Sequence, residues 1–328
     1  MWGDGGAGKL GLGNHDTKTT PQKVPLPNVI AISLGDESAA AITSNGDLYT
    51  WGANDARQLG LPTTGANTTG GWSAPIKVAG ISNVTAVSMG YRHCLAITSN
   101  GDLYVWGHNM SGALGTGDRG DTYIEAPQKL AGLSNITAIC AGANRSAAIT
   151  SGGDLYTWGD NLYGFIGHGT SGTTSTPQKV SGLSNLVDLA FGRYHSMAVT
   201  ASGDLYTMGS SHDDALLGHG EENDSYTTPQ KVASISNAVS VSAAMKYSMV
   251  LTGNGDLYAW GSGAGVGNGD QSWVINPVVV LSGVKVPGGG DGCATYATAR
   301  AGSHSNAHSF DSTAQRRKRG VRRLQYQR

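Results

Sequence analysis

The sequence predicts an all-β protein, a β-propeller of four-stranded blades. The first observation is the motif Gly-Asp-Leu-Tyr-x-Trp-Gly, which begins at Gly46, Gly101, Gly153 and Gly255, with Met instead of Trp in the copy at Gly203. The second is the spacing of 50 to 55 residues between successive copies, which is typical of a propeller or an array. The third is composition: 50 of the 328 residues are Gly and 14% are charged, which favours a sheet protein rich in turns.

The same landmarks surround every copy of the motif, in the same order. A short apolar run that ends in Thr comes before it, and Leu-Gly or a variant follows the Trp after a Gly-rich stretch. A Pro that opens a β-prone run comes next, mostly as Thr-Pro-Gln-Lys-Val, and a Ser-Asn or Pro-Asn pair then leads into the next unit. A recurring order of this kind indicates one supersecondary unit repeated along the chain.

Residues 80–130 serve to predict the strands of one unit. We expect an Asn100-Gly101 hairpin with a type I′ turn, because both central residues of that turn need positive φ. We also expect a turn at Gly90–His93. Four short antiparallel strands are the content of one propeller blade. The predicted strands are Asn83–Gly90, Cys94–Thr98, Leu103–Trp106 and Pro127–Leu130.

The large side chains of the motif are predicted to form the core between blades. Leu103 and Tyr104 are neighbours in a strand, so they point to opposite faces of the sheet. Both faces of a blade pack on the adjacent blades, which explains why both residues are large and why Trp106 recurs.

Strand direction sorts the loops between the two ends of a blade. If the first strand runs up, the Gly-x-x-His turn is at the top, the Asn-Gly hairpin is at the bottom, and the third strand returns to the top. The long loop after each Trp then lies on the same face as the Gly-x-x-His turn. Variation between repeats is concentrated on this face, so we expect a partner to bind there.

These residues resemble the regulator of chromosome condensation repeat family, through Gly-x-x-His-x-x-Ala-Ile-Thr, Gly-x-Leu-Tyr-x-Trp-Gly, Leu-Gly-x-Gly and Pro-x-x-Val. The resemblance covers residues 1 to about 286. It implies a β-propeller, usually of seven blades. Members of the family include a nuclear exchange factor for a Ras-like GTPase and many protein-interaction modules.

The domain boundary is predicted at 286/287, with repeats over 1–286 and a degenerate half-repeat followed by a basic, disordered tail over 287–328. Five complete units and about half of another are present, which is the amount of sequence that a fragment of a seven-bladed ring would contain. The net charge is −1 overall, but +6 from Pro287 onward and −7 before it. The acidic repeats argue against nucleic-acid binding, and only the basic tail is suited to it.

Two departures from the family weaken the resemblance to the exchange factor. The family's His position holds Ser38, His93, Arg145, His195 and Tyr247, so two of five match. The sequence also lacks an inserted hairpin of the wedge kind that the exchange factor uses.

The sequence shows no catalytic motif. Gly5–Leu10 imitates a phosphate-binding loop, but it aligns with the loop after Trp in the other repeats, and no helix pattern follows it. Cys94, Cys140 and Cys293 have no metal-site spacing. We therefore expect a protein without enzymatic activity, cofactor or metal. Gly- and Asp-rich stretches at 115–121 and 267–270 leave calcium binding as an alternative.

The candidate partner-binding residues lie in the turns of the loop-rich face. Arg and aromatic side chains gathered on one face are the usual anchors of a protein interface. The candidates are Tyr91, Arg92, His93, Arg145, Arg193, Tyr194, His195, Lys246 and Tyr247.

The predicted function is a non-enzymatic interaction scaffold that binds a protein partner through this face. One alternative is a guanine-nucleotide exchange factor, with a Ras-like small GTPase as the partner. Another is a secreted or surface propeller that binds carbohydrate or calcium. The sequence has no run of 18 apolar residues that would predict a membrane span, and no signal peptide is recognisable. The compartment stays open between the cytoplasm and secretion.

Overall fold

The computed structural model describes residues 1–62, 71–212, 214–222, 224–269 and 272–284. Within these ranges there are five antiparallel sheets of four strands, each in the order of the chain. Blade 1 comprises β1 (Val29–Leu34), β2 (Ser38–Thr43), β3 (Leu48–Gly52) and β4 (Trp72–Lys77); blade 2 comprises β5 (Val84–Met89), β6 (His93–Thr98), β7 (Leu103–His108) and β8 (Tyr123–Lys129); blade 3 comprises β9 (Ile136–Ala141), β10 (Arg145–Thr150), β11 (Leu155–Gly159) and β12 (Thr174–Lys179); blade 4 comprises β13 (Leu186–Phe191), β14 (His195–Thr200), β15 (Leu205–Ser210) and β16 (Ser225–Lys231); blade 5 comprises β17 (Ala238–Ala243), β18 (Tyr247–Thr252), β19 (Leu257–Gly261) and β20 (Val274–Leu281).

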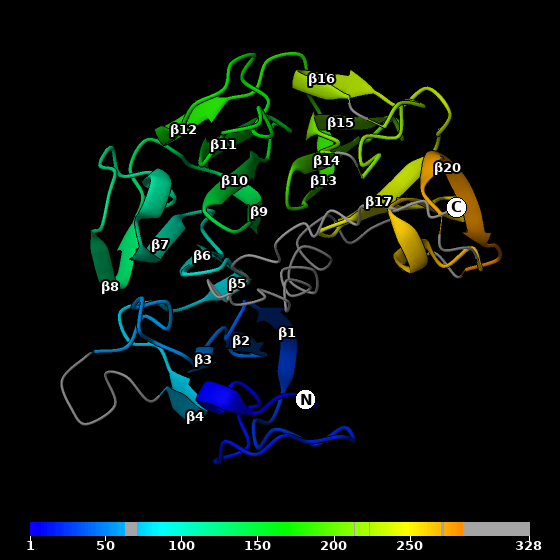
Figure 1. Ribbon diagram of the computed structural model, residues 1–328. Coiled ribbons are helices and arrows are strands. Elements are labelled where there is room, and N and C mark those ends of the chain that lie inside the picture. The colour runs from blue at the N-terminus through cyan, green and yellow to red at the C-terminus, as the bar shows by residue number, and fades with distance from the viewer. Residues whose placement is uncertain (63–70, 213, 223, 270–271, 285–328) are drawn as a thin grey trace, which may run out of the picture.

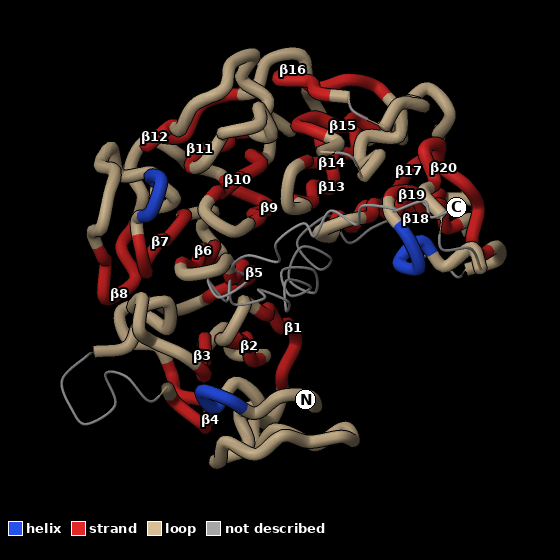
Figure 2. The backbone as a smooth tube through the Cα atoms, viewed as in Figure 1, coloured by secondary structure: helices blue, strands red, loops and turns tan. Residues whose placement is uncertain are grey.

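The blades stand side by side in an arc, with blades 1 and 5 at its two ends (Figure 1). The first strands β5, β9, β13 and β17 line the inside of the arc and contact one another in turn, whereas the fourth strands lie on the outside. Three short 3₁₀ turns, η1 (Gly6–Gly8), η2 (Met110–Gly112) and η3 (Gly263–Val266), are the only helical elements of the described residues (Figure 2). The prediction of an all-β propeller with four-stranded blades is confirmed.

The core lies between the blades, as the alternation along each third strand predicts. On β7, Leu103 and Val105 belong to the apolar cluster between blades 2 and 3. Tyr104 and Trp106 point the other way and pack in the cluster between blades 1 and 2. Blade 2 therefore contributes both faces to burial, and burial of such apolar surface is the main force that holds neighbouring blades together.

The recurring Trp of one blade packs against the recurring Leu-Gly of the preceding blade. Trp106 Nε1–H donates to the carbonyl of Gln58, in the loop of the preceding blade, at 3.0 Å. A Cβ added to Gly60 would lie 2.8 Å from that Nε1, and Gly60 has a φ of +67°. Gly is therefore needed for both its conformation and its lack of a side chain, and Gly115 is in the same relation to Trp158.

The Lys two residues after the landmark Pro forms an ion pair with the Asp of the motif. In blades 1 to 4 each pair joins the residue just before the third strand to the last residue of the fourth strand, at an N–O distance of 2.8 Å. The pairs are exposed, so we assign them little stability. They are Lys77–Asp47, Lys129–Asp102, Lys179–Asp154 and Lys231–Asp204.

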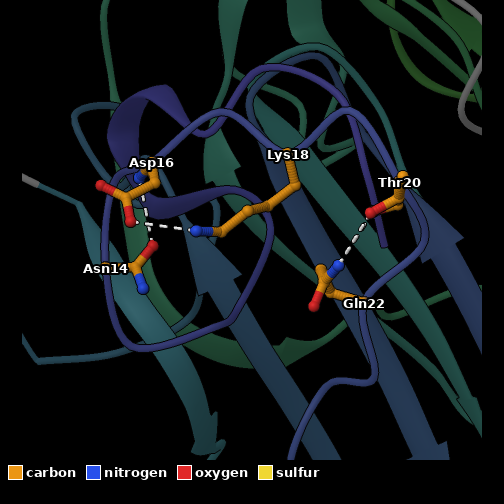
Figure 3. Close-up of polar contacts among 5 residues, drawn as sticks. All are labelled: Asn14, Asp16, Lys18, Thr20 and Gln22. Carbon is orange, nitrogen blue, oxygen red and sulfur yellow. Dashed lines mark hydrogen bonds and ion pairs between the residues drawn. The ribbon is translucent and has the colours of Figure 1, made fainter.

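The first residues of the chain lie against blade 1 and are joined by one isolated antiparallel bridge. Gly3 and Lys18 exchange backbone hydrogen bonds of 2.7 and 2.9 Å. Side-chain contacts stabilise the segment 16–22: Lys18 forms an ion pair of 3.0 Å with Asp16, and Gln22 donates to the hydroxyl of Thr20 at 3.1 Å (Figure 3). Trp51 of blade 1 donates to the carbonyl of Lys9, so this N-terminal segment occupies the place that a preceding blade has elsewhere.

Two local predictions were wrong. The hairpin at Asn100-Gly101 is not a type I′ turn, since only Gly101 has positive φ (+74°). Instead, Gly101 N–H donates to Thr98 O, which is a longer loop with one left-handed Gly. The fourth strand begins at Tyr123 rather than Pro127, because Tyr123 and Ile124 pair with the end of β7.

The predicted boundary at 286/287 and the basic tail lie outside the described residues, as does Cys293.

Candidate functional site

The turn between the first and second strands and the loop after the third strand share one face of each blade. In blade 2, His108 N–H donates to the carbonyl of Arg92 at 2.8 Å. In blade 4, Ser210 N–H donates to the carbonyl of Tyr194 at the same distance. The Asn-Gly hairpins lie at the other end, where Gly46 O accepts from Val84 N–H. We call the first face the upper face. The turn and the loop after the third strand share it, as the strand direction predicts.

Two of the nine candidate residues are histidines that the structure buries between blades. His93 Nε2 shares a hydrogen bond of 2.9 Å with Ser146 Oγ of blade 3, and His195 Nε2 shares one of 2.7 Å with Ser248 Oγ of blade 5. Both rings are buried. The two histidines therefore occupy separate inter-blade positions, each with a Ser partner.

Arg145 stands at the same position of blade 3 and is also buried. Its guanidinium donates to the backbone carbonyls of Gly192 and Arg193 in the turn of blade 4. It lies 3.9 Å from the ring centroid of Phe165 and 5.1 Å from that of Phe191. Burial lowers the pKa of Arg145 to about 10, so the side chain stays charged at neutral pH.

The turn that Arg145 holds presents an exposed group of rings on the upper face. Tyr194 stacks on His212 with a centroid separation of 4.2 Å, and Tyr163 meets Tyr194 edge-on at 5.4 Å. Arg193 lies over the Tyr194 ring and donates to Met245 Sδ at 3.3 Å. We call Tyr163, Arg193, Tyr194, His212 and Met245 the Tyr194 cluster.

The Tyr194 cluster draws on three consecutive blades. Tyr163 comes from the loop after β11, Arg193 and Tyr194 from the turn before β14, His212 from the loop after β15, and Met245 from the turn before β18. Leu162, beside Tyr163, is 66% exposed. Aromatic, Arg and Met side chains are the types enriched at the centres of protein interfaces.

The four remaining candidates lie in blades 2 and 5. Lys246 is exposed and pairs with Asp214 at 3.5 Å, and Tyr247 is half-buried. Tyr91 and Arg92 lie in blade 2, where Arg92 pairs with Asp55 at 3.5 Å. The structure thus brings Arg193 and Tyr194 together, and keeps Tyr91 and Arg92 two blades away.

The sequence prediction omitted Tyr163, His212 and Met245. The first two lie in loops whose residues do not repeat between blades, so their proximity to Tyr194 has no periodic signal. The available signal was Leu162-Tyr163, two adjacent large apolar residues where the corresponding loop of blade 2 has only one, Met110.

The buried His93 predicts acid sensitivity. Burial lowers the pKa of His93 to about 4 in the folded protein, from 6.5 in the unfolded chain. Between these values the unfolded state binds the extra proton, so stability falls as the pH falls. We expect His93 to account for a loss of about 2 kcal/mol between pH 7 and pH 4.5.

Urea unfolding at the two pH values measures this loss. His93→Ser, which copies Ser38 of blade 1, should show a smaller difference between pH 7 and pH 4.5 than the parent chain. The exposed His15→Gln should keep the parental difference. An equal pH dependence in the parent and His93→Ser contradicts the prediction.

Among the residues that the structure describes, no three His, Cys, Asp or Glu side chains gather as metal ligands. Cys94 is buried in β6, and Cys140 is half-buried in β9. None of the helical elements in the described ranges has the length and apolar character that crossing a bilayer requires.

Comparison with known proteins agrees with this architecture. The ultraviolet-B receptor UVR8 of Arabidopsis thaliana is 33% identical over 286 residues, which cover 81% of this chain and 62% of UVR8. Human WBSCR16 superimposes with a TM-score of 0.71 at 20% identity, covering 82% of this chain and 73% of that one. Prp20p of Saccharomyces cerevisiae superimposes with a TM-score of 0.58 at 21% identity, covering 86% and 85%.

The chain spans less than two thirds of UVR8, so UVR8 contains sequence without a counterpart here. The structural likenesses, at 20% and 21% identity, concern the fold alone. A family match extends over residues 1–303, which include all five blades. This chain therefore belongs to the RCC1-like domain family.

Proposed function

We propose that this chain is a non-enzymatic interaction propeller that binds a protein partner through the Tyr194 cluster. The observation that carries the proposal is the packing of three exposed or half-buried rings and an Arg at a junction of three blades. Such a site offers a large contact area whose side chains already support one another, so little conformational entropy is lost on binding. A protein partner fits this surface because it supplies the apolar and acidic groups that rings and Arg193 contact.

The relatives support a binding role for this architecture. The published structure of Prp20p is described together with its binding to Gsp1p and histones, and yeast RCC1 (Prp20) is also known bound to Kap60. These partners belong to Prp20p. For the present chain they make a protein ligand the reasonable expectation, with its identity to be found by experiment.

The test places a photo-crosslinking amino acid at position 163 of the full chain in cells. We expect a defined adduct whose yield falls at least tenfold with Tyr194→Ala or Arg193→Glu, because central anchor residues typically contribute about 2 kcal/mol or more. The same crosslinker at the exposed Asn100, in a hairpin of the lower face, is the control for non-specific capture. Equal adducts from both positions, or adducts that ignore the substitutions, would exclude this face as the binding site.

Exchange of guanine nucleotide on a Ras-like GTPase stays the alternative prediction. The same purified chain, mixed with a GTPase loaded with labelled nucleotide, would then accelerate release of the label. Accelerated release that Tyr194→Ala abolishes would replace the scaffold proposal with an exchange factor that uses the same face.

A further inference from the structure

The loop that carries His212 covers an oxygen-rich position at the end of blade 4. Ser210 and Ser225 are the last register pair of β15 and β16, and Ser211 N–H donates to the carbonyl of Asp224 at 2.8 Å. Ser211 and Asp224 are therefore directly opposite each other, and their side chains project from the same face of the ladder. Thr207, on that face, donates to the carbonyl of Leu217, which places the loop over it.

Both side chains are buried without a hydrogen-bonding partner. Ser211 is 0% exposed and Asp224 is 5% exposed. Within the described residues, neither carboxylate oxygen of Asp224 nor the hydroxyl of Ser211 has a hydrogen-bond partner. A buried carboxylate without a donor or a cation is costly, so this position requires a positive charge or a proton.

A second carboxylate, that of Glu221, interacts with the buried Asp224 carboxylate. Two adjacent carboxylates repel each other, and this repulsion is relieved when a cation lies between them.

Blade 2 shows what the same two positions look like when they are self-sufficient. Asn109 N–H donates to the carbonyl of Thr122, so this pair corresponds to Ser211 and Asp224. The Asn109 amide accepts from Leu114 N–H at 3.0 Å and donates to the carbonyl of Asp118 at 3.0 Å. In blade 4 the amide is replaced by a hydroxyl, and a carboxylate faces it. Blade 4 therefore lacks the amide N–H donor that closes the loop in blade 2, and the two side chains offer only oxygen atoms.

We propose that Ser211, Glu221 and Asp224 bind a calcium ion. Ca²⁺ takes six to eight oxygen ligands in flexible geometry, so two carboxylates and a hydroxyl supply part of its shell and water completes it. Mg²⁺ demands a smaller octahedral site and gives up its water reluctantly, so we expect it to bind here more weakly than Ca²⁺. Bound Ca²⁺ would join the loop after β15 to β16, as the Asn109 amide joins the corresponding loop of blade 2.

The test is a titration of the full chain, stripped with a chelator, with CaCl₂ and separately with MgCl₂. We expect one Ca²⁺ per chain by calorimetry, a Ca²⁺-dependent rise in melting temperature, and weaker binding of Mg²⁺. Asp224→Asn should weaken Ca²⁺ binding at least about tenfold, since it removes a charged ligand with almost no change of shape. Asp224→Thr, the residue of blade 2, should have a similar effect.

The matched control is Asp55→Asn, which alters an exposed Asp in the loop after β3 of blade 1 and should leave the affinity unchanged. If an Asp224 variant fails to fold, Glu221→Gln provides the same comparison at an exposed position. Absence of Ca²⁺ binding, or equal affinity in the parent chain and the variants, would overturn the proposal. A melting temperature that changes with pH but not with Ca²⁺ would assign the position to a shared proton instead. This titration needs no protein partner, so its result is independent of the proposed interaction role.

Discussion

Replacing Trp158 by Ala is expected to lower the free energy of unfolding by about 3–5 kcal/mol, the range for removing a large aromatic side chain from a core. Trp158 is fully buried in the apolar cluster between blades 2 and 3. Its Nε1–H donates to the carbonyl of Ala113 in the preceding blade at 2.9 Å. The substitution therefore removes apolar contacts and an inter-blade hydrogen bond together.

The chain contains its own matched control for this change. Met208 holds the equivalent position in blade 4, where it is buried in the cluster with blade 3. Trp158→Met should therefore cost clearly less than Trp158→Ala, because Met fills much of the volume and adapts its shape to the gap. The loss of the hydrogen bond is tolerable, since Ser146 Oγ also donates to the Ala113 carbonyl at 2.7 Å.

Chemical denaturation of the parent and both variants measures these differences. Unfolding in urea should give the order parent, Trp158→Met, Trp158→Ala, from most to least stable. If Trp158→Met proves as damaging as Trp158→Ala, the indole hydrogen bond matters more than the volume, and our assignment of the stability to packing is wrong.

The blade itself could be predicted because its signals repeat. Leu103 and Tyr104 alternate between two buried faces, and that alternation is visible in a single strand. The role of Gly60 was not predictable in the same way, since its reason lies in Trp106 of the next blade. A repeat motif records such a contact as a constant residue without showing what it touches.

The candidate site was predicted in position but only partly in membership. The Gly-x-x-His pattern reads as a turn, yet His93 and His195 begin the second strand and turn their rings to the next blade. Burial of that kind depends on how two blades pack, which the pattern of one blade does not contain. Tyr163 and His212 come from loops that differ in every repeat, so only the folded arrangement joins them to Tyr194.

Arg145→Ala is expected to cost about 3–5 kcal/mol of stability and also to disturb the Tyr194 cluster. The substitution leaves a cavity against Phe165 and Phe191, and it removes the donor to the Gly192 and Arg193 carbonyls. Cavity formation and unsatisfied buried carbonyls are each destabilising. Because Arg193 is the residue next to Tyr194, loss of its carbonyl contact loosens the turn that presents the rings.

Arg145→His is the variant that separates these effects. The two other blades with His at this position bond it to a Ser of the following blade, and Ser196 stands at the corresponding place in blade 4. A His at 145 can therefore bond Ser196 Oγ, and we expect Arg145→His to recover a large part of the stability lost in Arg145→Ala. It does not reach the carbonyls of Gly192 and Arg193, however, so the turn remains less supported than in the parent chain.

The two readouts should then diverge. Thermal or urea unfolding should rank Arg145→His close to the parent, whereas crosslinking from position 163 should be reduced in both variants. If Arg145→His restores stability and crosslinking alike, Arg145 acts only as core packing, and the upper face does not depend on its hydrogen bonds. If crosslinking falls while stability is kept, the buried guanidinium is the link between the inter-blade core and the exposed rings. Arg at this one position, where two other blades have His, would then be explained by the surface it supports.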